Sequence, residues 1–79
     1  KKIEITQKDD KGDPSRFQMT IVLNVNIINE NYNKTQSFSS SFNYSNNSDK
    51  FALKQYEKEI ENTLINKIVE KSVIYLSDL

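Results

Sequence analysis

The stretch RFQMTIVLNVNI, residues 16–27, decides the fold. Every second position from Phe17 to Ile27 is apolar without a break, which is the period of a β-strand with one buried face. The positions between them hold Gln18, Thr20, Val22, Asn24 and Asn26. The second face of this strand is therefore mostly polar but carries no charge. We expect the strand to cover residues 16–29 and to lie at the centre of a sheet, since its apolar face offers the most surface for burial.

Two further strands are predicted, one on each side of this stretch. Residues 2–8 alternate between apolar and polar side chains, and turn-forming Asp, Gly and Pro residues over 8–15 follow them as a hairpin loop. A second turn is expected over residues 29–34, and a third strand over residues 35–44. One face of that strand holds Phe38, Ser40, Phe42 and Tyr44, and the other holds Thr35, Ser37, Ser39, Ser41 and Asn43. The small, uncharged polar face therefore recurs.

The last third of the chain predicts one long helix over residues 49–77. Asn47, Ser48 and Asp49 are candidate N-caps, and no helix breaker follows until about Ser77. The apolar side chains recur mostly at four-residue spacing, which makes a stripe that drifts slowly around the helix. The stripe consists of Leu53, Tyr56, Ile60, Leu64, Ile68 and Leu76.

The fold class that follows is α+β. We expect an antiparallel meander of three strands and then one long C-terminal helix packed on one sheet face, as part of a two-layer α/β sandwich. The 79 residues make a single domain, and only 35% of them are apolar. One helix leaves part of the inner sheet face bare, so we expect an N-terminally truncated domain, with a further helix or strand outside residues 1–79.

The composition argues against an enzyme and against a bound cofactor. The chain has no His and no Cys, the residues that most often serve as general bases, nucleophiles and transition-metal ligands. Glu57 and Glu61 are expected on a solvated helix flank, and DDKGD, residues 9–13, at a hairpin tip and not in a metal loop. Eleven basic residues balance eleven acidic ones, which argues against nucleic acid as a partner.

A row of lysines is the strongest candidate for a binding site. Lys50, Lys54 and Lys58 recur every four residues at the start of the predicted helix, beside uncapped amides and the positive end of the helix dipole. This pattern suits a phosphate or another anion. The alternative is that Lys54 and Lys58 pair with glutamates three residues along on a solvated surface. Lys11, in the hairpin, is a weaker anion site because aspartates surround it.

The order and spacing of several short motifs resemble a known family. A Gly-containing hairpin leads into a strand that starts with Phe17, Gln18 and Met19, and a later strand ends in the aromatic stretch 42–44. After a polar gap come residues 52–53, Ala-Leu, and then an acidic stretch over residues 57–61. Over nearly all 79 residues the chain thus resembles the C-terminal portion of the LPS-assembly lipoproteins, the LptE family.

This resemblance implies a non-enzymatic component of lipopolysaccharide transport and outer-membrane assembly. Members of the family are lipid-anchored on the periplasmic side of the outer membrane, plug the β-barrel of the LPS translocon, assist its assembly and contact LPS. It implies an upstream lipid anchor as the means of membrane association. The family's basic LPS contacts correspond here to Lys54, with Lys50 and Lys58 beside it, and to Lys11 at the hairpin tip, where Asp10 replaces a basic residue.

A barrel partner would explain why the second faces of the two strands are polar but uncharged. A hydrated barrel wall suits a surface rich in hydrogen-bonding groups and poor in charge, so we predict a partner-binding face there. Its residues are Gln18, Thr20, Asn24, Asn26, Ser37, Ser39 and Ser41. The alternative is a generic periplasmic or surface module that binds a protein through a polar sheet face or a sheet edge. A double-stranded-RNA-binding half-domain shares the element order but lacks a glycine before the helix.

Overall fold

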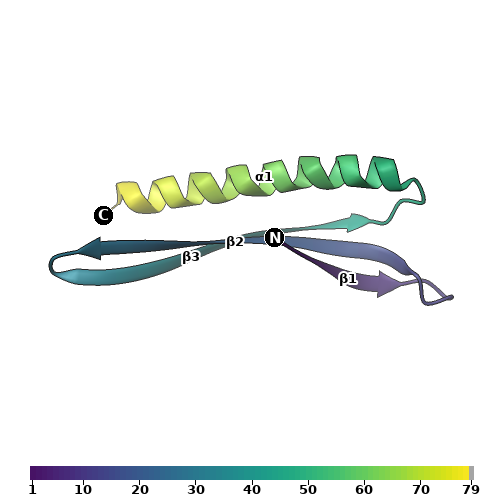
Figure 1. Ribbon diagram of the computed structural model, residues 1–79, viewed down its shortest axis with the longest axis horizontal. Helices are drawn as coiled ribbons and strands as arrows, with labels where there is room; N and C mark the ends of the chain where they lie inside the picture. The colour runs from purple at the N-terminus through teal and green to yellow at the C-terminus, as the bar shows by residue number, and fades with distance from the viewer. Residues whose placement is uncertain (79) are drawn as a thin grey trace.

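The computed structural model describes residues 1–78, apart from the side chain of Tyr32. Its elements in chain order are β1 (Lys2–Lys8), β2 (Pro14–Asn29), β3 (Tyr32–Ser45) and α1 (Lys50–Ser77). The three strands are antiparallel and ordered β1-β2-β3, and α1 lies along one face of the sheet (Figure 1). The predicted α+β meander and the central position of the second strand are therefore confirmed.

The hairpins are tighter than the sequence suggested. β2 begins at Pro14, two residues before the predicted start, since Pro14 pairs with Lys8 at the end of the ladder, where a strand tolerates proline. β3 begins at Tyr32, because Asn29 pairs with Tyr32 and leaves only two residues in the turn. The predicted turns over residues 8–15 and 29–34 were therefore too long.

The β1–β2 loop is held by its own hydrogen bonds. The Asp9 carboxylate accepts the backbone N–H groups of Lys11 and Asp13, both at 2.9 Å, and Gly12 adopts a positive φ of 84°. Only glycine takes that conformation without strain. The acidic DDKGD segment is thus a hairpin turn in which Asp9 is occupied by backbone donors.

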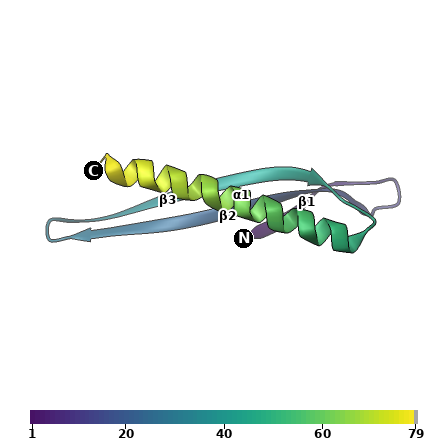
Figure 2. The ribbon, with the colours of Figure 1, turned by 90° about the horizontal axis from the view of Figure 1, so that it is seen from above.

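Asp49 starts α1, as one of the three predicted N-caps. Its side-chain Oδ1 accepts the N–H groups of Phe51 at 3.0 Å and Ala52 at 3.2 Å. From there the helix runs obliquely across the strands (Figure 2). Its inner side and the sheet share one core cluster, which consists of Met19, Tyr44, Leu53, Ile60 and Leu64, with Phe17 and Ile21 packed against it.

Two members of the predicted helix stripe lie outside the core. Tyr56 is 43% exposed and Leu76 47% exposed, whereas Ser72 is buried. A four-residue step advances about 400° around the helix, so each successive member of the stripe rotates about 40° further from the sheet. Leu76 has rotated out by the last turn. Tyr75 takes its place, and its ring packs edge-on against Phe38 at 5.6 Å between centroids.

A single helix covers only part of the apolar sheet face. Of the six alternating residues of β2, Met19 alone is fully buried, while Leu23 is 39% exposed. Ile3 and Ile5 of β1 are 41% and 50% exposed on the same face, since α1 lies over β2 and β3. The expectation that one helix leaves part of the inner face bare is therefore confirmed.

The molecule is elongated, with extents of 57 × 21 × 15 Å. Its radius of gyration is 16.8 Å, against about 12 Å for a compact domain of this length. The solvent-accessible surface is 5984 Å², about 1,000 Å² more than is usual for this mass. The chain therefore exposes more surface than a compact domain of its mass.

Candidate functional site

A recess of about 230 Å³ lies between the start of β1 and the first half of α1. Its lining contains three lysines and two glutamates, which are Lys1, Lys54, Lys58, Glu57 and Glu61. Lys54 and Lys58 come from successive turns of one helix flank, and Lys1, the residue before β1, reaches the recess with its side chain. The lining therefore carries a net positive charge.

Both carboxylates of the recess have partners other than the helix lysines. The Glu61 carboxylate accepts a hydrogen bond from Lys1 Nζ at 3.0 Å, and the Glu57 carboxylate accepts one from the Tyr44 hydroxyl. Among the residues that the structure describes, neither Lys54 nor Lys58 has an ion-pair partner. The pairing of Lys54 and Lys58 with these glutamates, which was the alternative to anion binding, is not formed. The two ammonium groups are therefore available to an anion.

The hydrogen bond from Tyr44 to Glu57 ties the recess to the core. Tyr44 is only 2% exposed and lies between the rings of Phe17 and Tyr56. Burial, and then the nearby Glu57 carboxylate, raise the pKa of the Tyr44 hydroxyl well above its ordinary value of 10.0. Tyr44 thus stays protonated and continues to donate to Glu57 throughout the neutral range.

This raised pKa predicts how stability depends on pH. In the unfolded chain Tyr44 loses its proton near pH 10, whereas the folded protein retains it. The contribution of Tyr44 is thus fully present below about pH 10 and is lost progressively above it. We expect the free energy of unfolding, measured in urea, to fall between pH 9.5 and 11 (roughly this window). The fall should be shallower in Tyr44→Phe. Equal slopes in the two proteins would contradict the raised pKa.

The other two predicted anion-binding lysines lie outside the recess. Lys50 Nζ donates to the Asn46 side-chain oxygen at 3.1 Å, next to the N-cap. Lys11 lies in the β1–β2 loop, which Figure 1 shows on the lower side of the sheet, away from α1. The structure therefore brings together Lys54 and Lys58 and adds Lys1, but it does not gather all four predicted lysines.

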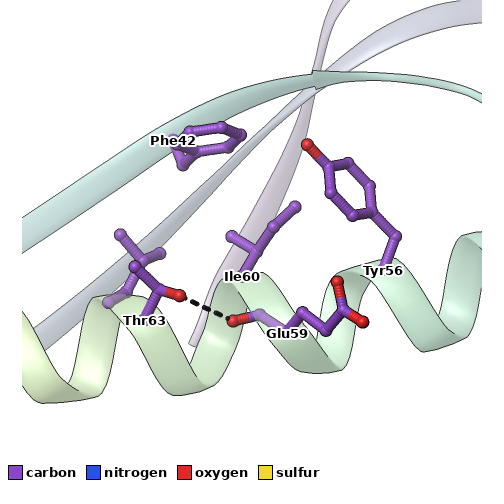
Figure 3. A pocket seen from close by; sticks show the side chains of 6 residues that line it. Phe42, Tyr56, Glu59, Ile60 and Thr63 are labelled. Atoms are coloured by element: carbon purple, nitrogen blue, oxygen red, sulfur yellow. Dashed lines mark hydrogen bonds between the residues drawn. The ribbon is translucent and has the colours of Figure 1, made fainter.

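An apolar pocket of about 170 Å³ lies on the opposite flank of α1. Phe42 of β3 and Tyr56 of α1 stand over Ile60 in Figure 3, and Thr63 closes one side with its hydroxyl donating to the Glu59 carbonyl at 3.0 Å. Phe42 and Tyr56 are 41% and 43% exposed. Sequence reasoning placed both on the inner face and so missed the pocket, because an apolar residue at the margin of a core has the same pattern as one inside it.

The predicted partner face is contiguous. The register pairs Thr20 with Ser41, Val22 with Ser39, and Asn24 with Ser37, all on the sheet face that α1 leaves uncovered. Hydroxyl groups donate across the strands, from Ser37 to Asn24 and from Thr35 to Asn26, both at 2.6 Å. These ladders orient the side-chain amides. The face carries no charge over residues 18–28 of β2 and 33–43 of β3. At its β1 margin, however, Lys2 and Glu4 lie opposite Thr20 and Gln18 and form an exposed ion pair.

Two apolar side chains interrupt this polar face. Val22 is 55% exposed and Ile28 is 75% exposed. Both lie on even-numbered positions of β2, which share the uncovered face with Thr20 and Asn24. Neither was among the predicted site residues, although their alternation with polar neighbours was visible in the sequence.

Residues 1–78 contain no group of three or more side chains that is suited to hold a metal ion. The same residues include no helix with both the length and the apolar character needed to cross a membrane. No protein-family model matches the chain, and comparisons with the curated proteins and with the solved structures find no match either.

Proposed function

We propose that this chain is part of a non-enzymatic outer-membrane component of LPS assembly, of the LptE kind. In this proposal it contacts lipopolysaccharide through Lys54 and Lys58 and presents its polar sheet face to the wall of the translocon β-barrel. The observation that supports the proposal most strongly is the pair of lysines without carboxylate partners among the described residues, on the helix side of the sheet and opposite the polar face.

The chemistry around α1 suits an anionic lipid. Lipid A joins phosphate groups to acyl chains, so a site for it needs both cations and apolar surface. Lys54 and Lys58 offer the cations on one flank of the helix. The pocket between Phe42 and Tyr56 offers apolar surface on the opposite flank, about one helix diameter away. Ammonium groups attract phosphate without requiring a fixed geometry, which suits a head group of variable structure.

The sheet face suits the inside of a hydrated barrel. Its Asn, Ser, Thr and Gln side chains donate and accept hydrogen bonds, directly or through water, and bring no charge that burial would penalise. We propose that the protein acts on the periplasmic side of the outer membrane, held there by a lipid anchor outside residues 1–79. Its partners are then the LPS-translocon β-barrel and LPS itself.

Charge substitutions on the sheet face test the barrel contact. Asn24→Lys and Thr20→Lys place a charge on the proposed interface and should reduce several-fold the β-barrel protein that co-purifies with the full-length protein from native membranes. Gln55→Lys adds the same charge to the exposed side of α1 and should leave recovery unchanged. Recovery of the full-length protein from native membranes with no barrel partner would overturn this part of the proposal.

A second candidate function is that of a protein-binding module that uses a sheet edge or the polar face without any LPS contact. The exposed side chains of Val22 and Ile28 favour it, because apolar groups on an otherwise polar face are typical of protein contacts. This candidate would be favoured if Asn24→Lys reduced the amount of β-barrel protein that co-purifies and the chain bound no LPS.

A further inference from the structure

Among the described residues, β1 pairs with only one half of the β2 edge. Lys2, the first residue of β1, lies opposite Thr20, and the pairing extends from there to Pro14. Figure 1 shows β1 along one half of the sheet, while β2 and β3 continue through the other half. Among the described residues, no strand pairs with this side of β2 over residues 21–29.

This edge lacks the usual protection against strand pairing. Residues 17–29 include no charged side chain and no proline, which are the features that commonly keep exposed edges apart. The outer edge of β3 differs, because Lys71 of α1 donates to the Ser39 carbonyl there at 3.0 Å. Of the two edges, the β2 edge is therefore the better suited to pair with a further strand.

We propose that residues 21–29 of β2 pair antiparallel with the same residues of a second copy of this chain, with Val25 opposite Val25. A strand that pairs antiparallel with its own copy needs the same order of apolar and polar residues from either end. Residues 22–28 have this symmetry. The pairing brings Val22 opposite Ile28, Leu23 opposite Ile27, and Asn24 opposite Asn26. Apolar residues meet apolar residues and amides meet amides.

Faces and ends also match in this register. Paired positions are both odd or both even, so inner side chains meet inner side chains and the two helices lie on the same side of a continuous sheet. Val22 and Ile28, which are exposed on the polar face of the monomer, gain each other as cross-strand neighbours. The register ends with Asn29 of the second copy opposite Ile21, one position beyond the Thr20–Lys2 pair, so that Glu30 of the second copy follows close to Lys2. An acidic turn thus meets the basic start of β1.

The whole chain exposes about 1,000 Å² more surface than a compact chain of its mass. Pairing along the β2 edge buries part of this surface. The proposed pairing also extends the sheet without displacing β1, since β1 and the second copy occupy different halves of the same edge.

Sedimentation equilibrium of the 79-residue chain tests the association, and charged pairs test where it occurs. We expect a dimer at micromolar concentrations. V22K/I28K places lysines opposite lysines and should give monomers, as should V22E/I28E with glutamates, while an equimolar mixture of these two variants should restore the dimer. Asn43→Lys, which adds a charge to the same sheet face on β3, should leave the dimer intact.

Single cysteines test the register, because the chain has none of its own. Val25→Cys places two thiols directly opposite each other and should form a disulfide-linked dimer under mild oxidation. Ile28→Cys should not, although Ile28 is 75% exposed, since its symmetry mate lies six residues along the strand, roughly 20 Å away.

Three results would overturn the proposal. The first is a chain that stays monomeric at 200 μM (roughly the upper end of such assays). The second is cross-linking of the Ile28→Cys variant without cross-linking of the Val25→Cys variant. The third is a longer form of the protein that stays monomeric because its own segment pairs with this edge.

Discussion

Replacing Leu64 by alanine is expected to lower the free energy of unfolding by about 2–5 kcal/mol. Leu64 is 1% exposed and lies in the core cluster with Met19, Tyr44 and Ile60, where α1 crosses the sheet. The substitution removes buried methyl groups and leaves a cavity at the interface between helix and sheet. Few other core contacts hold the single helix on the three-stranded sheet, so the loss is a large part of the total. Urea titration followed by circular dichroism measures the loss.

The neighbouring residue provides the matched control for Leu64→Ala. Ile65 has the same number of side-chain carbons and lies on the same helix, but it is 42% exposed. Ile65→Ala should therefore cost less than about 1 kcal/mol, since it loses little buried surface and gains helix propensity. Comparable losses in both variants would contradict the placement of Leu64 at the centre of the core.

The size of the Leu64 effect matters because the total stability is small. A chain of this length is stable by roughly 4–12 kcal/mol, and its incomplete burial favours the lower part of that range. Leu64→Ala should therefore leave a measurable fraction of the chain unfolded at 37 °C (roughly physiological temperature). A gain of stability in this variant on addition of LPS would also link the fold to its ligand.

Most of the fold was predictable because local patterns determined it. The unbroken alternation from Phe17 to Ile27 left no other regular structure for β2, and a short connection on each side made the antiparallel meander the only economical topology. Asp49 was recognisable as an N-cap because its carboxylate precedes an uninterrupted helical segment.

The details that failed depend on which surfaces meet. The spacing of Tyr56 and Leu76 suits a helix stripe, but only the crossing of α1 over the sheet decides that Tyr75 and not Leu76 faces Phe38. Likewise, the alternation in β2 identifies its inner face without telling how much of that face one helix covers. Such outcomes require the tertiary arrangement.

The candidate site was only partly predictable for the same reason. The spacing of Lys54 and Lys58 placed them on one flank of the helix, as the recess confirms. Lys1 lies 60 residues from its partner Glu61 in the sequence, and the Tyr44 hydroxyl reaches Glu57 from another element. These long-range contacts occupy the carboxylates of Glu57 and Glu61. The spacing along the helix had instead suggested the nearby lysines as their partners.

Reversing both unpaired lysines, K54E/K58E, is expected to weaken LPS binding by roughly tenfold or more. The change removes two attractions to phosphate and adds two repulsions, beside glutamates that already line the recess. Because both side chains are exposed and have no ion-pair partner among the described residues, the fold should persist. An unchanged urea midpoint separates loss of binding from loss of structure.

The matched control is a double change elsewhere in the molecule. Lys8 and Lys67 are exposed and lie outside the recess, so Lys8→Glu and Lys67→Glu together alter the net charge by the same amount. The control should retain most of the affinity for LPS if the contact is local to the recess. Equal loss in both double variants would indicate attraction to net charge alone.

The most direct test of the proposed function is a titration of LPS against the folded chain and these two double variants, read by isothermal titration calorimetry at constant ionic strength. The account predicts saturable binding by the unmodified chain, a loss of about tenfold in K54E/K58E and little change in the Lys8/Lys67 variant. Absence of saturable LPS binding by the unmodified chain, or equal affinity in K54E/K58E, would contradict it.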